Sequence, residues 1–300
     1  YIAPASSATT AKYEFTIRGL DNVFESFEDV RFFYYEDYKN IDTKTGKAIK
    51  DTIKILDINK DEGLETVNEI AKLGVEVTFY QIDVADENSW IEFSKFLKNK
   101  KRLIDILVNN AGIWIGKDID NVSLEEYQRL ISINLTGVFL GIKYLVPFLT
   151  KAGKKTKFGS TIINLSSVAG LVGSQLDPLY SMTKGGITTF TKSMAIYFGK
   201  NKFPIRINQV HPGIIETDMG TQVYKARISQ NPEMTTEESI SAGINQTPIG
   251  RLGTADEVAK TILFLSSDNS SFMTGSSLVV DGCLLYTSDA ADEEDSVDLG

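Results

Sequence analysis

Short apolar stretches alternate with longer amphipathic ones along most of this chain, from Asp51 to Gly282. The short stretches are rich in Ile, Val and Leu, as buried strands are, and the longer ones repeat their apolar residues at the spacing of a helix. A strand followed by a helix, repeated several times, predicts a parallel sheet whose strands are joined by helical crossovers. The predicted strands are 52–58, 75–84, 103–109, 159–167, 204–213 and 277–282.

The longest amphipathic stretch, residues 123–149, predicts a buried helix of six or seven turns. It begins with a capping box, in which Ser123 occupies the N-cap and Glu126 lies three residues further on. Asn134 lies in the middle of the stretch, where a buried amide needs hydrogen-bond partners. Asn134 is therefore either a functional residue or one that satisfies the backbone of a bent helix.

The sequence contains every element of a doubly wound dinucleotide-binding fold that follows the first strand and helix. We therefore predict an α/β, Rossmann-like parallel sheet in a single domain over residues 52–282, with the first strand and helix missing or replaced. Residues 214–250 form a polar, irregular segment that is longer than an ordinary connection. Because this segment follows the carboxyl end of a strand, where such sheets bind ligands, it is placed to cover a substrate.

Residues 1–51 are atypical of this fold. Residues 13–19 could form a strand and a helical pattern follows them, so the two could replace the missing first strand and helix. The helical pattern consists of Leu20, Phe24, Phe27, Val30 and Tyr34. We interpret the aromatic run at 31–38 as a packed helix face or as out-of-context translation, rather than as a platform for a ligand. No glycines in the chain fit G-x-G-x-x-G or G-x-x-x-G-x-G, the turns whose backbone approaches the pyrophosphate of a dinucleotide.

Composition limits the partners and the compartment. The formal net charge is −9, and six acidic residues beyond position 288 leave only about −3 for residues 1–282. We expect neither nucleic acid nor an anionic membrane as a partner. A single cysteine, Cys283, and a single histidine, His211, exclude an internal disulfide and argue against a metal site. The cysteine usage favours a reducing compartment, so we expect a cytoplasmic protein. Since no apolar run approaches 18 residues, we expect it to cross no membrane.

Residues 283–300 resemble the translation of a sequencing-library adapter more than a protein segment. They begin where the strand at 277–282 completes the domain. We interpret them as an artefact, with a disordered acidic tail as the alternative. The chain begins without Met and without the apolar centre of a signal peptide, so we expect a fragment in which a missing targeting signal proves little.

Tyr180 and Lys184 are four residues apart on a helix predicted at 177–199, so their side chains share one face. Ser167 lies thirteen residues before Tyr180, at the carboxyl end of a predicted strand. Removing hydride from a carbinol carbon also requires a base for the hydroxyl proton. Bringing the pKa of a tyrosine from about 10 to near 7 requires roughly 4 kcal/mol of preferential stabilisation of the anion. A lysine ammonium one turn away, together with an oxidised nicotinamide ring, can lower the pKa in this way.

Several motifs occur in the order and spacing of one enzyme family. They are NNAG at 109–112, IIN at 162–164 leading to Ser167, YSMTK at 180–184, HPG at 211–213 and the stretch from 248 to 282. On these motifs the chain resembles the short-chain dehydrogenase/reductase family over residues 52–282. It departs from that family in lacking the glycine-rich turn T-G-x-x-x-G-x-G, which puts pyrophosphate binding in question.

The resemblance implies an NAD(H)-dependent enzyme that interconverts a secondary alcohol and a ketone. It places the catalytic roles on Asn134, Ser167, Tyr180 and Lys184, with Tyr180 as acid and base, Ser167 on the substrate oxygen and Asn134 in a water relay to Lys184. It places cofactor contacts on Asp57, Ile58, Asp83, Val84, Asn110, Ala111, Gly112, Tyr180, Lys184, Pro212, Gly213, Ile215 and Thr217. Asp57 would accept a hydrogen bond from a free ribose 2′-hydroxyl and repel a 2′-phosphate, which favours NAD over NADP.

Several of these residues also have structural interpretations. Asp57 could cap a helix, although Asn59 is the better cap, and Asp83 could be an ordinary acid at a strand end. We expect His211 to pack within the fold. Trp90 is expected in helix packing, and Trp114 at the edge of the cleft as a substrate-pocket candidate.

The sequence is consistent with two alternative functions. In the first, the chain is an alcohol dehydrogenase or ketoreductase whose glycine-rich turn is missing because the sequence was assembled wrongly. In the second, residues 1–51 are authentic and the chain is a catalytically silent binding or interaction module. The partner of the enzyme would be a small-molecule alcohol or ketone, with cyclic alcohols, hydroxysteroids and polyols all open. By analogy we expect a homo-oligomer, a tetramer or dimer, formed through the helices at 123–149 and 177–199.

Overall fold

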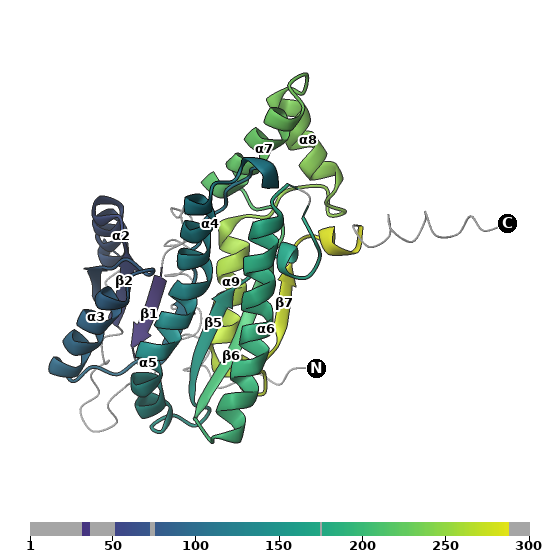
Figure 1. The fold of residues 1–300 in the computed structure, drawn as a ribbon. Coiled ribbons are helices and arrows are strands. Elements are labelled where there is room, and N and C mark those ends of the chain that lie inside the picture. The colour runs from purple at the N-terminus through teal and green to yellow at the C-terminus, as the bar shows by residue number, and fades with distance from the viewer. Residues whose placement is uncertain (1–31, 37–51, 73–75, 175, 288–300) are drawn as a thin grey trace.

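The computed structural model describes residues 32–36, 52–72, 76–174 and 176–287. These residues form one sheet with helices packed against it, as Figure 1 shows. The order of the strands across the sheet is β3-β2-β1-β4-β5-β6-β7. The predicted fold class, an α/β Rossmann-like sheet, is confirmed.

Apart from β1, the strands of the sheet agree with the predicted ones to within a few residues. They are β1 (Phe32–Glu36), β2 (Thr52–Asp57), β3 (Glu76–Gln81), β4 (Ile106–Asn109), β5 (Ser160–Leu165), β6 (Ile205–Pro212) and β7 (Ser277–Val280). The helices are α2 (Lys60–Lys72), α3 (Glu87–Asn99), α4 (Leu124–Ile131), α5 (Gly137–Gly153), α6 (Pro178–Lys200), α7 (Asp218–Gln230), α8 (Thr236–Asn245) and α9 (Ala255–Ser266).

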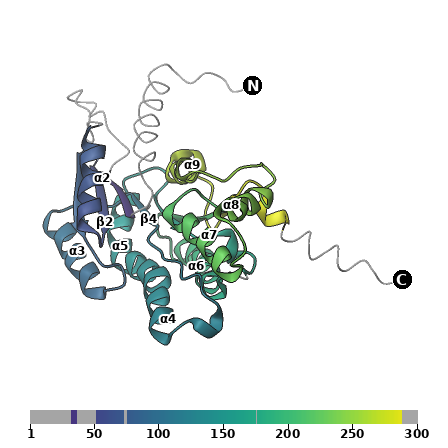
Figure 2. The same cartoon turned by 90° about the horizontal axis from the view of Figure 1, so that it is seen from above.

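Two apolar layers hold the helices to the sheet, and β4 shows how one strand serves both. Leu107 packs into the layer beneath α3, α5 and α6, whereas its neighbours Ile106 and Val108 pack into the layer beneath α9. Figure 2, looking down on the molecule, shows α9 on one side and α5 and α6 on the other. Because both faces are covered, β4 and β5 are buried along their whole length.

The first strand differs from the prediction. β1 occupies the gap between β2 and β4, and it runs antiparallel to both of them. The aromatic run at 31–38, predicted as a helix face, therefore contributes a strand, and the sheet is not wholly parallel. Aromatic residues have high strand propensity, and a central strand satisfies the backbone groups of both neighbours. The strand and most of the helix predicted at 13–34 lie outside the described residues.

The long helix predicted at 123–149 is present with its capping box, and it extends to Gly153. A single π-helical turn, Ser132–Thr136, interrupts it at the buried Asn134. By length and composition this continuous helix could cross a membrane, contrary to the expectation that no such stretch exists. Its apolar residues Leu145 and Leu149 are fully buried against the sheet, as in the core helix of a globular fold.

Residues 214–250, predicted as irregular, contain the two helices α7 and α8. Figure 1 shows both helices standing beyond the end of the sheet. Gln230 of α7 donates a hydrogen bond to Asp118 at 3.0 Å, which links this segment to the loop that follows β4. The segment therefore lies where the sequence places a substrate cover.

The beginning of the stretch interpreted as an artefact is folded. The N–H groups of Cys283 and Leu285 donate to the carboxylate of Asp281 at 2.9 and 2.7 Å. Thr287 donates to the carbonyl of Gln246 at 3.1 Å. The remaining residues, 288–300, lie outside the described part of the chain.

Candidate active site

The candidate site is built at the carboxyl ends of β4, β5 and β6, which lie side by side in the sheet. Ser167 follows β5 and caps a short 3₁₀ turn, where its hydroxyl accepts a hydrogen bond from Ala169 N–H at 3.2 Å. Tyr180 and Lys184 come from the first two turns of α6. Asp177 caps this helix and Pro178 stands at its first position, which fixes where the first turn begins.

Tyr180, Lys184 and Ser167 converge. The Ser167 side chain lies close enough to the Tyr180 hydroxyl to act on its pKa through a hydrogen bond. The ammonium of Lys184 lies 5.4 Å from the centroid of the Tyr180 ring and donates to the carbonyl of Leu165 at 2.8 Å. The spacing of four residues predicted this shared face.

The pKa of Tyr180 does not follow the prediction. Burial of the phenol raises the pKa, and this outweighs the opposing effect of Ser167. The charge of Asp177 raises the pKa further. Burial also lowers the pKa of Lys184 to about 8. Within the protein alone, the cost of burying a phenolate therefore exceeds what the hydrogen bond from Ser167 offsets.

Asn134 contacts the loop after β4 and not Lys184. Its Oδ1 accepts from Ile113 N–H at 2.8 Å, and its Nδ2 donates to Ile113 C=O at 2.9 Å and to the Thr183 hydroxyl at 3.1 Å. Both amide protons are thus engaged. The alternative interpretation expected Asn134 to satisfy the backbone of its own bent helix, whereas Asn134 bonds to the backbone of the loop after β4.

Gly112 lies between Asn134 and Lys184, two of the four catalytic candidates. A Cβ at this position would lie 3.4 Å from Asn134 Oδ1 and 3.5 Å from Lys184 Nζ. A side chain there would fill the space over the lysine. Asn110, Ala111 and Gly112, the predicted cofactor wall, are partly buried and follow β4 at the same edge.

The residues predicted to contact the adenosine end of the cofactor differ in their exposure and in their contacts. Asp57 Oδ1 accepts from Asn59 N–H at 2.7 Å, while Asn59 caps α2, and Ile58 is 62% exposed beside them. Asp83 accepts from Ala85 N–H at 2.9 Å, as an ordinary acid at a strand end does. The side chain of Val84 is buried and its carbonyl accepts from Trp90 Nε1 at 2.9 Å, so neither of these groups can face a ligand.

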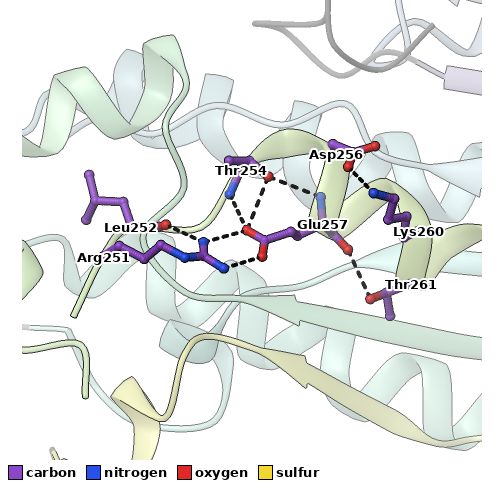
Figure 3. A network of polar contacts seen from close by, with 7 residues as sticks. All are labelled: Arg251, Leu252, Thr254, Asp256, Glu257, Lys260 and Thr261. Carbon is purple, nitrogen blue, oxygen red and sulfur yellow. Dashed lines mark hydrogen bonds and ion pairs between the residues drawn. The ribbon is translucent and has the colours of Figure 1, made fainter. Parts of the chain in front are cut away.

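The loop before α9 pairs with the segment that follows β6. Ile215 pairs with Gly253 in a short parallel bridge. Figure 3 shows the polar network next to this bridge, in which Arg251 and Thr254 both bond to Glu257 at the start of α9. The candidates Pro212, Gly213, Ile215 and Thr217 lie together along this segment, and the Thr217 hydroxyl also caps α7.

A family model described as enoyl-(acyl carrier protein) reductase matches residues 50–284. The chain belongs to the short-chain dehydrogenase/reductase family. Cyclopentanol dehydrogenase of Comamonas sp. is 37% identical over 231 residues, which cover 77% of this chain and 86% of the relative. The NADP-dependent (R)-specific alcohol dehydrogenase of Lentilactobacillus kefiri is 32% identical over 206 residues, which cover 69% and 76%. The crystal structure of levodione reductase has 26% identity and a TM-score of 0.70, and covers 78% of this chain and 87% of that one.

Membership of the short-chain dehydrogenase/reductase family confirms the predicted class, an oxidoreductase. It does not decide between NAD and NADP, because the Lentilactobacillus relative is NADP-dependent.

The described residues of this short-chain dehydrogenase/reductase place Asp57 at the end of β2 for a ribose and Lys184 on α6 for the nicotinamide side, but hold no turn for the pyrophosphate. In β1, Phe32 pairs with Leu56 and Glu36 pairs with Thr52. The chain therefore leaves β1 at the edge opposite the carboxyl ends of β2 and β4. A doubly wound fold binds pyrophosphate at the turn and helix that follow its first strand at the carboxyl edge. No such turn follows β1 at that edge within the described residues.

Two functional candidates escaped the sequence analysis. Asp177 is buried and bonds to the loop after β4 as well as to its own helix. Met219 of α7 lies with its sulfur 3.9 Å from the Tyr180 hydroxyl. The pair Asp177-Pro178 before Tyr180 is a recognisable helix start, but its contacts across the fold have no sequence signal.

His211, expected to pack within the fold, is fully buried beside Ser167. Its Nδ1 lies 2.8 Å from the Ser167 carbonyl. A carbonyl only accepts, so Nδ1 carries the proton in this contact.

Proposed function

We propose that this short-chain dehydrogenase/reductase interconverts a secondary alcohol and a ketone, with Tyr180 as acid and base and NAD as the hydride carrier. The observation that carries the proposal is the convergence of Ser167, Tyr180 and Lys184 at the carboxyl edge of the sheet. The nicotinamide, when bound, supplies hydride transfer. The described residues would carry out the proton transfer.

In oxidation, Ser167 would hold the substrate hydroxyl and Tyr180 would remove its proton. In reduction, Tyr180 would return the proton to the carbonyl oxygen. Lys184, with a pKa of about 8, keeps most of its charge at neutral pH and favours the phenolate. Asn134 would act through the loop that it holds at Ile113, and the proposed water relay to Lys184 would use its remaining acceptor capacity.

The proposed preference for NAD rests on Asp57 at the carboxyl end of β2. A carboxylate there suits a free ribose hydroxyl and opposes a phosphate. Substitution of Asp57 with Ser should reduce the ratio of NAD to NADP affinity about tenfold or more, because the repulsion is removed. An unchanged ratio would place cofactor discrimination elsewhere.

A cyclic secondary alcohol is the proposed substrate type. The relative from Comamonas, 37% identical, is named a cyclopentanol dehydrogenase, and the matched crystal structure is a levodione reductase. Turnover of cyclopentanol and cyclohexanol with NAD, followed at the absorbance of NADH, tests this substrate class directly.

The decisive variant is Tyr180→Phe, which keeps the ring and removes the acid and base. We expect turnover to fall at least about 100-fold while affinity for NADH stays within a factor of about two. Tyr286→Phe is the matched control, since Tyr286 follows β7 and its side chain is 69% exposed. Turnover that survives in Tyr180→Phe refutes the mechanism.

A second function, a catalytically silent binding module, is favoured by the direction of β1. NADH titration of the full chain separates the two functions. Saturable binding that enhances nicotinamide fluorescence supports the enzyme. Binding of AMP without binding of NADH supports the silent module, because the protein would then have a site for the adenosine end alone.

Oligomer formation is also proposed. The outer faces of α5 and α6 expose the apolar side chains of Phe139, Ile196 and Tyr197. Burying such side chains between copies would remove them from water. Light scattering after gel filtration should report a dimer or tetramer, and the double substitution Phe139→Ser and Ile196→Ser should shift it toward the monomer.

A further inference from the structure

A cavity of about 390 Å³ opens beside the candidate catalytic residues. Its walls come from the loop at 112–117, from α4 and from the first turns of α7. This volume suits a small molecule and not a large one. The cavity belongs to the end of the fold where Gln230 of α7 is tied to Asp118 of the loop.

The cavity adjoins the proposed proton donor. Met219 lines it, and the sulfur of Met219 lies 3.9 Å from the Tyr180 hydroxyl. Gly112 also lines it, and a Cβ at Gly112 would lie 3.5 Å from Lys184 Nζ. A molecule bound in the cavity would therefore lie next to the groups that handle the proton.

Three charged side chains line the cavity, and two of them neutralise each other. Lys117 Nζ lies 2.5 Å from Glu126 Oε1, and the second oxygen of Glu126 accepts from Ser123 N–H at 2.9 Å. These contacts lower the pKa of Glu126 to about 2, so the carboxylate stays ionised and engaged. The charge of Lys117 is thus balanced.

Arg129 is the third charged residue of the lining. It lies one helical turn after Glu126 on α4, but no ion pair or side-chain hydrogen bond engages its guanidinium within the described part of the chain. The charged lining therefore carries one net positive charge. Trp114 and Met219 supply apolar surface to the same cavity.

We propose that this cavity binds the carboxylate of an anionic substrate through Arg129, so that the enzyme acts on compact secondary alcohols or ketones that carry a carboxylate. This inference rests on the proposed function and names its substrate class. A guanidinium presents two parallel donors that match a carboxylate. One unbalanced positive charge also matches the single charge of a carboxylate better than the larger charge of a phosphate monoester, which Glu126 would oppose.

Binding can be measured without cofactor or turnover, because Trp114 lines the cavity. Trp90, the second tryptophan of the chain, is buried in the core and gives a constant background. Cyclohexanecarboxylate and its neutral counterpart cyclohexanecarboxamide would be titrated at pH 7 while tryptophan fluorescence is followed. We expect the carboxylate to bind about tenfold more tightly than the amide.

The variant Arg129→Gln should bind both ligands with the same affinity. The control Arg102→Gln changes the net charge equally at an exposed arginine before β4, at the opposite edge of the sheet, and should keep the tenfold preference. Equal affinities in the native chain, a preference that survives in Arg129→Gln, or no binding of the carboxylate would each overturn the proposal.

Turnover then distinguishes this inference from the proposed function. If the carboxylate binds through Arg129 but hydroxycyclohexanecarboxylate is not oxidised with NAD or NADP, the anion site stands and the proposed function fails. If neutral cyclic alcohols are oxidised with kcat/KM equal to that of the hydroxy acid, the proposed function stands and the anion site fails.

Discussion

The buried carboxylate of Asp177 joins the catalytic helix to the loop that lines the cavity. One oxygen accepts from Tyr180 N–H at 2.8 Å, and the other accepts from Gly116 N–H at 2.9 Å. Ile115 N–H donates to the second oxygen as well, at 3.0 Å. Gly116 adopts a positive φ of 63°, a conformation that favours glycine, and its α-carbon lies against the ring of Trp114. A single side chain therefore fixes the proposed base relative to the substrate loop.

Substitution of Asp177 with Asn should damage both stability and substrate binding. The amide must either turn its NH₂ group toward the N–H donors of the loop or release the cap of α6. We expect the free energy of unfolding to fall by about 1–3 kcal/mol, measured by urea denaturation. KM should rise more than kcat falls, because the loop lines the cavity while Tyr180 stays on α6. Asp120→Asn, an exposed acid on the same connection, is the matched control and should change neither value.

The contacts of Asn134 predict a structural role that can be measured apart from catalysis. In Asn134→Ala, both backbone groups of Ile113 lose their partner. The free energy of unfolding should fall by about 2–4 kcal/mol, since each buried polar group left unpaired costs about 1–3 kcal/mol. Asn88→Ala, at an exposed position of α3, is the control. A variant as stable as the native chain would show that the loop finds other partners, and the role of Asn134 would then be catalytic only.

Much of the fold could be predicted because burial imposes a simple pattern. β4 and β5 are covered on both faces, so apolar residues stand next to one another in them, as at 106–108 and 162–163. The capping box of Ser123 and Glu126 marks the start of α4. The direction of β1 has no such signal. An aromatic run such as 32–36 satisfies a strand in either direction and also matches a helical spacing, and only the open position between β2 and β4 decides among them.

The site was predictable as a set of residue types but not as a set of contacts. The spacing of Tyr180 and Lys184 follows from helix geometry, so their shared face could be predicted. The direction of the tyrosine pKa could not, because it depends on how much water the folded chain removes from the phenol. Asp177 was missed since its two loop partners are about 60 residues away in sequence, at Ile115 and Gly116.

Lys184 should make the stability of the protein depend on alkaline pH. Burial lowers its pKa to about 8 from an ordinary 10.5, so between these values the unfolded chain binds more protons than the folded one. The free energy of unfolding should therefore rise with pH across this window by up to about 3 kcal/mol from this group. Above pH 10 the raised pKa of Tyr180 acts in the opposite direction. Lys184→Met should remove the rise between pH 8 and 10 in urea denaturation, and a rise of the same size in that variant would assign it to another group.

His211 should produce a second pH dependence, on the acidic side. Its Nδ1–H donates to the Ser167 carbonyl, and its buried Nε2 has no partner among the described residues, so protonation would create an unpaired buried charge. Burial lowers its pKa below the ordinary 6.5, Lys192 and Lys184 lower it further, and the bond to Ser167 opposes them.

The unfolded chain consequently binds the His211 proton first, and stability from this group is lost as the pH falls below about 6.5. The chain has one histidine, so a single imidazole signal reports the titration by NMR. His211→Asn keeps an N–H donor for the Ser167 carbonyl but cannot titrate, so its stability should fall less between pH 6.5 and 5. An imidazole that titrates above 6.5, or an equal loss of stability in His211→Asn, would show that this ring is not held neutral against the Ser167 loop.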